Sequence, residues 1–353
     1  MNDMIDLPSL IVQAAHRRAS DIHLVAGVPI RLRIDGMLTD FNEHRLTPEE
    51  CEAYARSLSS NYSDIASIGE QDLAVTFPDG TRCRINLFRQ RGCISAAIRI
   101  LNERIPTFEE LHLPPVAQTF TSYNQGIVLV TGETGSGKST TLACMLDHMN
   151  HCQRKHIITL EDPIEYLYTS DRCTINQREI GQDTRSFDDG LKAILREDPD
   201  VILVGEMRAL ATIETALIAA ETGHLVFATL HTNSAADAVD RIVDVFPAKQ
   251  QAQIRLQLSM TLKAVMCQQL LPHASGRGRI LATEVMIVNN AVRNLIREGK
   301  TPQITNVIAT NAAEGSVPMD SSLIRLYRER QITRETAINA AHDRNFVMKA
   351  TMI

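Results

Sequence analysis

The chain has 353 residues, of which 44% are hydrophobic and 22% are charged, and its formal net charge is −6. These values are typical of a globular protein long enough for two hydrophobic cores, and the acidic balance argues against a dedicated nucleic-acid binder. The seven cysteines are scattered without a C-x-x-C pair, which favours free thiols in a reducing compartment. The N-terminus lacks the basic region of a signal peptide, and no segment approaches the roughly 20 apolar residues of a membrane-spanning helix, so we expect a cytoplasmic protein.

Residues 1 to about 115 predict a small α+β domain. An amphipathic helix over 7–18 precedes two stretches, at 30–35 and 82–88, in which apolar and polar residues alternate. Such alternation is typical of strands with one buried face, and Asp-Gly turn signals lie near both stretches. The proline-containing segment that follows is interpreted as a linker that extends to about residue 125.

From residue 126 to residue 353 the pattern changes to that of an α/β domain. Four apolar runs without alternation are separated by amphipathic stretches, at residues 127–130, 156–160, 201–204 and 225–230. Runs that are apolar on both faces predict a parallel sheet covered by helices on both sides. From about residue 288 the pattern is mainly helical, and AVRNLIRE at 291–298 places its apolar residues on one face of a helix.

The strongest chemical signal is GETGSGKS at 132–139, which fits the phosphate-loop pattern G-x-x-x-x-G-K-[ST]. It follows an apolar strand and precedes a helical stretch, the context in which backbone N–H groups cradle phosphate oxygens. Lys138 would reach the β and γ phosphates, and Ser139 would offer its hydroxyl to Mg²⁺. The sequence thus predicts a site for a nucleoside triphosphate and Mg²⁺. The residues expected around the phosphates are Gly132, Glu133, Thr134, Gly135, Ser136, Gly137, Lys138, Ser139 and Thr140.

Acidic residues follow the next two predicted strands. Glu161, Asp162 and Glu165 lie just past one strand, and Glu206 follows another after a glycine. In an open α/β sheet, ligands lie outside the carboxyl ends of the strands, so both groups of acids belong on the phosphate side. Glu206 suits the Mg²⁺ role, and Glu165 suits the orientation or deprotonation of the attacking water. Glu161 and Asp162 fit solvated acids at a strand end as well as they fit a catalytic role.

A histidine stands at each end of the apolar run 225–230. Seven steps of roughly 3.3 Å along a strand separate His224 and His231 by about 23 Å, so the two cannot both contact one phosphate. His231 lies at the carboxyl end, beside the acids, and is the candidate to sense or position the γ-phosphate. His224 lies at the opposite edge, where we expect it to cap the strand or contact a neighbouring element.

Phosphoryl transfer also needs a cation near the leaving charge. The first domain offers several arginines, and in the second domain Arg196 and Arg208 flank the run 201–204. Arg99, which lies just before the predicted linker, is the better candidate, because domain movement there would carry it over the nucleotide.

With these residues in place, the chain resembles the PilT-type retraction motors of type IV pili, within the secretion ATPase superfamily. The resemblance runs nearly end to end. Its signatures are ASDIHLVAGVPIRLRIDG at 19–36, GETGSGKST as the Walker A motif, ITLEDPIEY as the aspartate box, ILVGEMR as the Walker B motif and GHLVFATLHTN as the histidine box. AVRNLIRE resembles the AIRNLIRE segment that is associated with retraction.

The resemblance implies a PAS-like domain over 1–115, a RecA-like ATPase domain over 126–353 and a homohexameric ring. It implies ATP and Mg²⁺ as cofactors, with Glu165 as the catalytic glutamate and Glu206 as the Walker B acid. The other side chains expected near the nucleotide are Arg82, Arg84, Arg99, Arg208, His224 and His231.

Three functions stay open at this point. The first is retraction of a type IV pilus by a ring ATPase at the cytoplasmic side of the inner membrane, acting on a membrane platform protein. An assembly ATPase or a second retraction ATPase would be a further partner. The second is a related motor for secretion or DNA transfer, and the third is a RecA-like nucleic-acid translocase. AVRNLIRE favours the first, whereas net acidity and the PAS-like domain argue against the third, so nucleic acid is not an expected partner.

Two departures from the family pattern stand out. Ala209 follows GEMR where the family usually has an acid, so a salt bridge is expected to be missing there. GSVPMDSSL at 315–323 replaces the more usual GMQTMDQSL, which affects the placement of the last helices. A tetracysteine zinc motif, usual in the extension ATPases of pilus assembly, is absent from the sequence.

Overall fold

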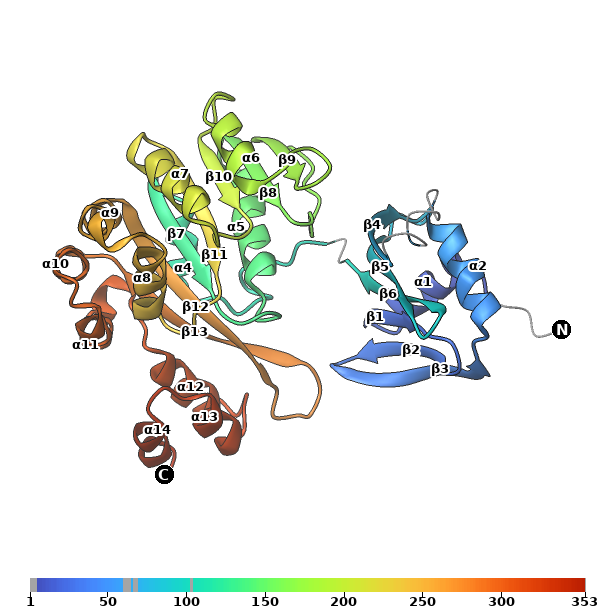
Figure 1. Ribbon diagram of the computed structural model, residues 1–353. Helices are drawn as coiled ribbons and strands as arrows, with labels where there is room; N and C mark the ends of the chain where they lie inside the picture. Colours follow the sequence, from blue (N-terminus) through green and yellow to red (C-terminus); the bar gives the residue numbers. More distant parts are fainter. Residues whose placement is uncertain (1–4, 60–64, 66–68, 102–103, 353) are drawn as a thin grey trace. The chain divides into compact units, whose positions relative to one another are not determined.

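The computed structural model describes residues 5–59, 65, 69–101 and 104–352, which Figure 1 traces in ribbon form. The chain divides into two compact units, Met1–Arg104 and Ile105–Ile353. Each unit has its own hydrophobic core. Over the described part of the chain, no helix combines the length and the apolar character needed to cross a bilayer.

The first unit is built on a six-stranded antiparallel sheet with the strand order β3-β2-β1-β6-β5-β4. Its elements are α1 (Leu7–His16), β1 (Ala19–Leu24), β2 (Pro29–Ile34), β3 (Met37–Arg45), α2 (Pro48–Leu58), β4 (Glu70–Thr76), β5 (Arg82–Gln90) and β6 (Cys93–Ile100). Alternation along β5 places Cys83, Ile85 and Leu87 in the core, as the period of a strand requires. Tyr54 of α2 joins this core, and its hydroxyl donates to the carbonyl oxygen of Ile5 at 2.7 Å.

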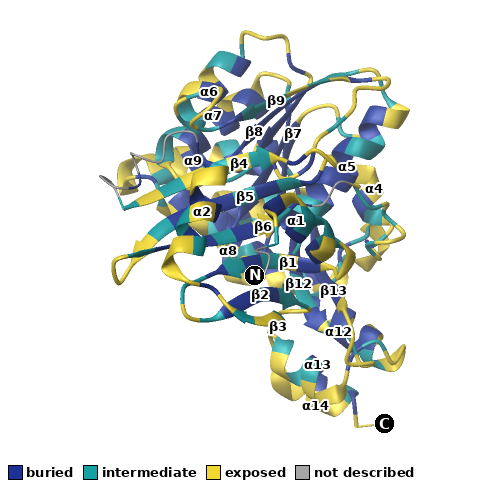
Figure 2. Cartoon of the chain, turned by 90° about the vertical axis from the view of Figure 1, so that its right-hand side faces the viewer, coloured by how far each residue is buried: buried dark blue, intermediate teal, exposed yellow. Residues whose placement is uncertain are grey.

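The second unit is built on a seven-stranded sheet with the strand order β13-β12-β7-β11-β10-β8-β9. Its strands are β7 (Gly126–Thr131), β8 (His156–Glu161), β9 (Thr174–Glu179), β10 (Val201–Val204), β11 (Leu225–Leu230), β12 (Leu262–Pro272) and β13 (Arg279–Ile287). Neighbouring strands are parallel, except that β12 and β13 are antiparallel. Every residue of β7, β10 and β11 is buried, and the dark blue strands of Figure 2 show this interior. Burial on both faces explains the continuously apolar sequences of these strands.

Helices cover both faces of this sheet (Figure 1). The α-helices of the second unit are α4 (Val116–Phe120), α5 (Lys138–Cys152), α6 (Phe187–Ile194), α7 (Leu210–Glu221), α8 (Ala235–Asp244), α9 (Ala248–Thr261), α10 (Asn290–Glu298), α11 (Ile304–Thr310), α12 (Met319–Arg328), α13 (Arg334–Ala340) and α14 (Arg344–Ala350). Val128 and Val130 of β7 share a core with α4 and α5. Ile127 and Leu129 face the other core, to which α6, α7, α8 and α9 contribute.

The α/β class predicted from the sequence is confirmed, and all four apolar runs are strands of the second sheet. Strands β9, β12 and β13 lie outside the predicted runs. β9 is an edge strand on which buried and exposed positions mix, and β12 and β13 form a long hairpin.

The segment interpreted as a linker differs most from its prediction. Residues 105–125 belong to the second unit, and Ala117 and Phe120 of α4 are fully buried in the core beneath α5. The division between the units therefore falls at Arg104, before the predicted boundary near residue 115. Prolines interrupt regular structure in this segment, but they do not prevent its apolar side chains from packing.

We expect Phe120→Ala to lower the free energy of unfolding by about 3–5 kcal/mol, because it leaves a cavity where a fully buried ring stood. Denaturant unfolding of the full chain measures the change. Gln118→Ala, at an exposed position of the same helix, is the matched control and should change stability by less than about 0.5 kcal/mol. An unchanged midpoint for Phe120→Ala would show that the segment is a linker after all.

Candidate active site

The loop between β7 and α5 has the tight geometry needed to enclose phosphate. Gly132 has a φ of 142°, and a Cβ at this position would lie 2.4 Å from the carbonyl oxygen of Gln268. Gly137, directly before α5, has a φ of 91°. Glycine adopts such conformations without the strain that a side chain introduces. The helix begins at Lys138, so the backbone N–H groups of its first turn face the loop and favour an anion there.

Lys138 is turned back over this loop. Its Nζ donates to the carbonyl oxygens of Gly132 and Glu133, each at 2.8 Å, and the residue is only 9% exposed. Burial lowers the pKa of Lys138, while the nearby carboxylates of Glu206 and Glu165 act in the opposite direction. The structure therefore brings the predicted lysine close to both predicted acids.

Glu206 follows β10 after a single glycine. A Cβ at Gly205 would lie 2.9 Å from the carbonyl oxygen of Leu160, which shows how closely the chain passes β8 here. The Oε1 of Glu206 is 2.8 Å from the Nε2 of His231, and the Nε of Arg208 donates to the same oxygen. The acid expected to hold Mg²⁺, the histidine expected to sense phosphate and the predicted arginine are thus in direct contact.

Glu165 is an exposed residue between two buried neighbours, Ile164 and Tyr166, and Tyr166 connects this segment to α5. The hydroxyl of Tyr166 is 3.0 Å from the Oγ1 of Thr140 in the first turn of the helix. The carboxylate of Glu165 is exposed and therefore accessible to water. This placement suits a group that receives a proton from an attacking water molecule.

The other two acids after β8 have different environments. Glu161 is buried and accepts hydrogen bonds from Thr159 Oγ1 at 2.6 Å and from Gln177 Nε2 at 3.2 Å. Burial raises the pKa of Glu161. Asp162 is exposed and precedes Pro163 through a cis peptide bond. Glu161 is therefore a buried, hydrogen-bonded group of the sheet rather than a solvated acid at its end.

The residues around the loop fit a triphosphate with Mg²⁺. The Oγ of Ser136 is buried and has no hydrogen-bond partner within the described residues. Phosphate oxygens would accept from this hydroxyl and from the N–H groups at the start of α5. Mg²⁺ in such sites is held by one or two side chains, with phosphate oxygens and water as its other ligands. The hydroxyl of Ser139 and the carboxylate of Glu206 are enough for this protein contribution.

His224 is not brought to this loop. β11 runs parallel to β7 with Leu225 opposite Gly126, so His224 lies at the amino edge of the sheet. The loop follows the other end of β7. At the usual rise per residue of a strand, the two ends of β7 are roughly 17 Å apart. The Nδ1 of His224 is 2.9 Å from the carbonyl oxygen of Ala219 in α7. As the strand geometry predicted, His224 contacts a neighbouring element, and it does not touch a nucleotide held by the loop of its own chain.

The three arginines predicted from the first domain share one face of its sheet. Arg84 and Arg99 are opposite each other on β5 and β6, and Arg82 projects from β5 on the same side as Arg84. The Nε of Arg99 donates to the Oδ1 of Asp21 at 2.9 Å. All three lie in the first unit and the loop lies in the second, so their contact with nucleotide stays a prediction.

Gln268 of β12 is a site residue that the sequence analysis does not identify. It is 1% exposed, its backbone carbonyl lies against Gly132, and its Nε2 donates to the Oγ1 of Thr141 in α5 at 2.7 Å. It therefore holds the loop and the helix in register. The feature of the sequence that could have indicated Gln268 is the glutamine pair in the apolar stretch 262–271. It becomes informative once β12 is known to lie beside β7.

A glycine-rich loop and helix at the carboxyl edge of a parallel sheet, with acids following β8 and β10, define a P-loop nucleoside triphosphatase. A family model described as "Type II/IV secretion system protein" matches residues 4–335. The type IV pilus retraction ATPase PilT of Pseudomonas aeruginosa is 44% identical over 335 residues, with 94% of this chain and 97% of that protein covered. A twitching motility protein of Neisseria gonorrhoeae is 46% identical over 316 residues, with 88% and 84% covered.

Structural similarity agrees with the sequence comparison. A crystal structure of the pilus retraction motor PilT with bound ADP matches with a TM-score of 0.89 and 46% identity, with 97% of this chain and 99% of that chain covered. The chain belongs to the type II/IV secretion system protein family, and within that family to the PilT-type ATPases.

We expect Glu165→Gln to retain nucleotide binding and to slow ATP hydrolysis by about 10²–10⁴-fold, because an amide does not accept the proton of the attacking water. Phosphate release and equilibrium nucleotide binding are the two measurements. Asp162→Asn removes an exposed carboxylate three residues earlier and should hydrolyse ATP at close to the wild-type rate. Hydrolysis by Glu165→Gln at the normal rate would refute its assignment as the base.

Proposed function

We propose that the chain is the ATP-driven ring motor of type IV pilus retraction, which depolymerises pilin through an inner-membrane platform protein. The observation that carries the proposal is the 44% identity with a pilus retraction ATPase over 94% of the chain. A phosphate-binding loop alone would fit many classes of nucleotide-dependent protein, whereas this similarity extends over both units. The proposed location is the cytoplasm, at the inner membrane through the pilus machinery.

The residues of the loop and of the acidic segments divide the work of hydrolysis. Lys138 exchanges its contacts with loop carbonyls for contacts with phosphate, and Glu165 takes the proton of the attacking water. Ser139 and Glu206 would hold Mg²⁺, which when bound offsets negative charge on the phosphates. His231 orients the carboxylate of Glu206 through their direct contact.

We interpret the first unit as a PAS-like domain and the second as a RecA-like ATPase domain that is followed by C-terminal helices. The six-stranded antiparallel sheet with its helices supports the first description, and the parallel sheet with its phosphate-binding loop supports the second. In the proposed homohexamer, ATP binds between the two domains. The arginines that would then close on the phosphates are Arg82, Arg84, Arg99 and Arg208.

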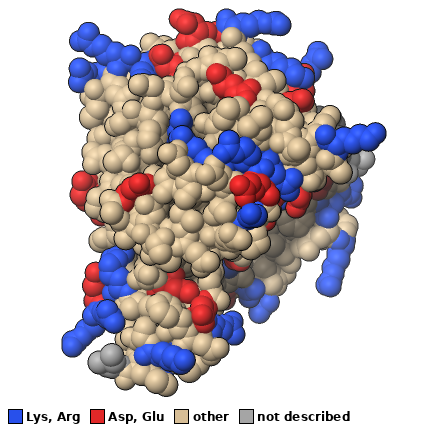
Figure 3. Space-filling model, turned by 90° about the vertical axis from the view of Figure 1, so that its left-hand side faces the viewer, with Lys and Arg blue, Asp and Glu red and all other residues tan. Residues whose placement is uncertain are grey.

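A nucleic-acid translocase is a weaker alternative. Translocases usually carry a strongly basic face, but this chain has a net charge of −6. On the face shown in Figure 3, Lys and Arg side chains form a short band near the middle, with Asp and Glu side chains beside it, and side chains of both charges are mixed around the edges. ATP turnover that nucleic acid stimulates strongly would favour this alternative over a pilus motor.

We expect deletion of the gene to leave cells with an excess of long pili that do not retract. Wild-type chain should restore retraction, and Lys138→Ala should not, because it removes the charge that contacts the β and γ phosphates. Fibre number per cell, together with retraction in live imaging, is the measurement. Cells without pili after deletion would indicate an assembly motor, and unchanged pili would favour a secretion or DNA-transfer motor.

A further inference from the structure

Glu284 of β13 is a buried carboxylate that takes no part in the nucleotide chemistry described above. It is 3% exposed and lies opposite Cys267 of β12. Burial raises the pKa of Glu284, whereas backbone N–H donors and His342 act in the opposite direction. A carboxylate inside a protein is costly unless partners compensate its charge. The identity of those partners therefore indicates why Glu284 is there.

The carboxylate of Glu284 connects three segments that are distant in the sequence. Its Oε1 accepts a hydrogen bond at 2.8 Å from the backbone N–H of Ala235, the first residue of α8. Its Oε2 accepts one at 3.5 Å from the backbone N–H of Met319, the first residue of α12. The Nδ1 of His342, which lies between α13 and α14, is 3.7 Å from the same Oε2.

The segment before α12 is attached to the same strand. Val317 and Val285 exchange two backbone hydrogen bonds, each of 2.8 Å. Further along, the Oγ of Ser322 accepts from the backbone N–H of Thr283 at 3.3 Å. The segment 315–323, in which this sequence departs from the family pattern, thus runs along β13 and delivers the first turn of α12 to Glu284.

His342 extends this connection to the loop 231–234, which follows β11. Its Nε2 is 3.1 Å from the carbonyl oxygen of Asn233, and since a carbonyl oxygen only accepts, Nε2 carries the hydrogen in this contact. The backbone N–H groups of His342 and Asp343 donate to the carboxylate of Asp320 in α12, at 2.8 and 2.9 Å. His342 is therefore fixed by α12 and in turn holds the loop.

The loop 231–234 begins with a residue of the nucleotide site. His231 is 2.8 Å from Glu206, and the charge of Glu206 acts on Lys138. Asn233 is two residues beyond His231, and Ser234 is the N-cap of α8. Because only one residue separates His231 from Asn233, we expect a shift of the Asn233 carbonyl to move the imidazole that contacts Glu206.

We propose that Glu284 and His342 are positioning residues of the ATPase, which hold the loop 231–234 against the helices α12–α14 and so set the place of His231 beside Glu206. The proposal rests on the proposed function, in which His231 and Glu206 belong to the nucleotide site. Coupling between two sites is reciprocal, so a nucleotide state that moves His231 also acts on α12.

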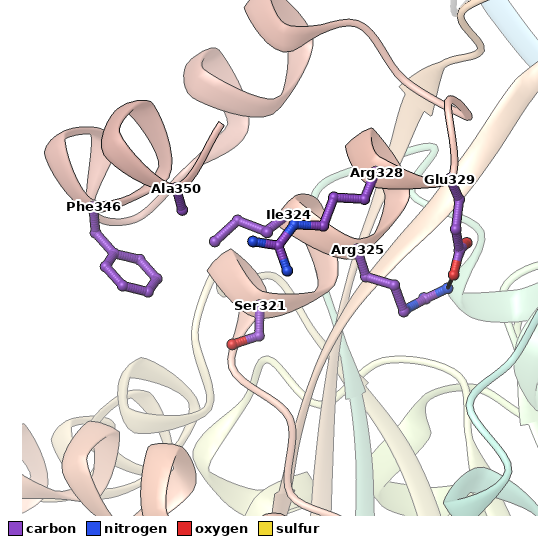
Figure 4. A pocket seen from close by; sticks show the side chains of 7 residues that line it. All are labelled: Ser321, Ile324, Arg325, Arg328, Glu329, Phe346 and Ala350. Carbon is purple, nitrogen blue, oxygen red and sulfur yellow. Dashed lines mark hydrogen bonds and ion pairs between the residues drawn. The ribbon is translucent and has the colours of Figure 1, made fainter. Parts of the chain in front are cut away.

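The helices held in this way carry an open surface elsewhere on α12. A cavity of about 400 Å³ lies between α12 and α14, where Figure 4 shows Ile324 and Arg328 of α12 together with Phe346 and Ala350 of α14. Phe346 is 52% exposed. One end of α12 is thus connected to the loop 231–234 through Glu284 and His342, while the side of the helix lines an accessible cavity.

The test is a double-mutant cycle on ATP turnover by the full-length protein. His342→Ala removes the contacts with Asn233 and Glu284, and we expect kcat to fall about tenfold while KM for ATP changes less than about twofold. In a His231→Ala background the same substitution should change the rate by less than about twofold, because its effect passes through His231. Single-turnover measurement resolves the low rates of these variants.

Two further variants separate positioning from a general structural role. His342→Gln, whose amide group is able to donate to the Asn233 carbonyl, should restore most of kcat. His151→Ala, at an exposed histidine whose hydrogen bond and ion pair go to Asp147 of the same helix, is the matched control and should behave as wild type. Thermal unfolding accompanies each variant. If His342→Ala does not fold, His342→Asn replaces it, because its shorter side chain falls short of Asn233.

Effects that multiply in the double variant would overturn the proposal, as would a kcat for His342→Gln as low as that of His342→Ala. An unchanged kcat for His342→Ala would do the same. Wild-type protein without ATP turnover would contradict the proposed function instead, so the two failures are distinguishable.

Discussion

The buried charge of Lys138 is the constraint on which the rest of the site depends. A cation removed from water is tolerated only when oxygen atoms surround it. Here two loop carbonyls lie at 2.8 Å, and the carboxylates of Glu206 and Glu165 add attraction. A parallel sheet supplies this arrangement because the carboxyl ends of its strands meet at one edge. The phosphate-binding loop, both acids and His231 follow strands of that edge, whereas His224 precedes β11 and lies at the other.

Much of the second unit could be predicted from the sequence, for a physical reason. β7, β10 and β11 are buried on both faces, so their sequences are continuously apolar and easy to recognise. The phosphate-binding loop is also recognisable from a short stretch of sequence, because the backbone conformation of the loop itself requires its glycines. β9 escaped prediction because an edge strand carries polar residues, and β12 because it directly follows α9, without a turn signal to separate them.

Features that depend on distant contacts could not be predicted. The prolines of residues 105–125 suggest a linker, yet burial of Phe120 attaches this segment to the second unit. Gln268 belongs to a pair of glutamines in an otherwise largely apolar stretch, and its role is evident only when its strand is placed beside the loop. The connection from Glu284 to His342 and Asn233 joins three parts of the chain that no local pattern relates. For His224, the length of a strand correctly predicted a position at the amino edge of the sheet, whereas family resemblance alone would have placed this histidine at the nucleotide.

Calorimetric titration of the full-length chain with a slowly hydrolysed ATP analogue and Mg²⁺ is the direct test of whether the loop 132–139 holds the phosphates. We expect one nucleotide site per chain in the wild type. We expect no measurable binding to Gly132→Ala, whose added Cβ would lie 2.4 Å from the Gln268 carbonyl oxygen and distort the loop. Folded Gly132→Ala protein that binds the analogue as tightly as wild type would contradict the claim that this loop holds the phosphates.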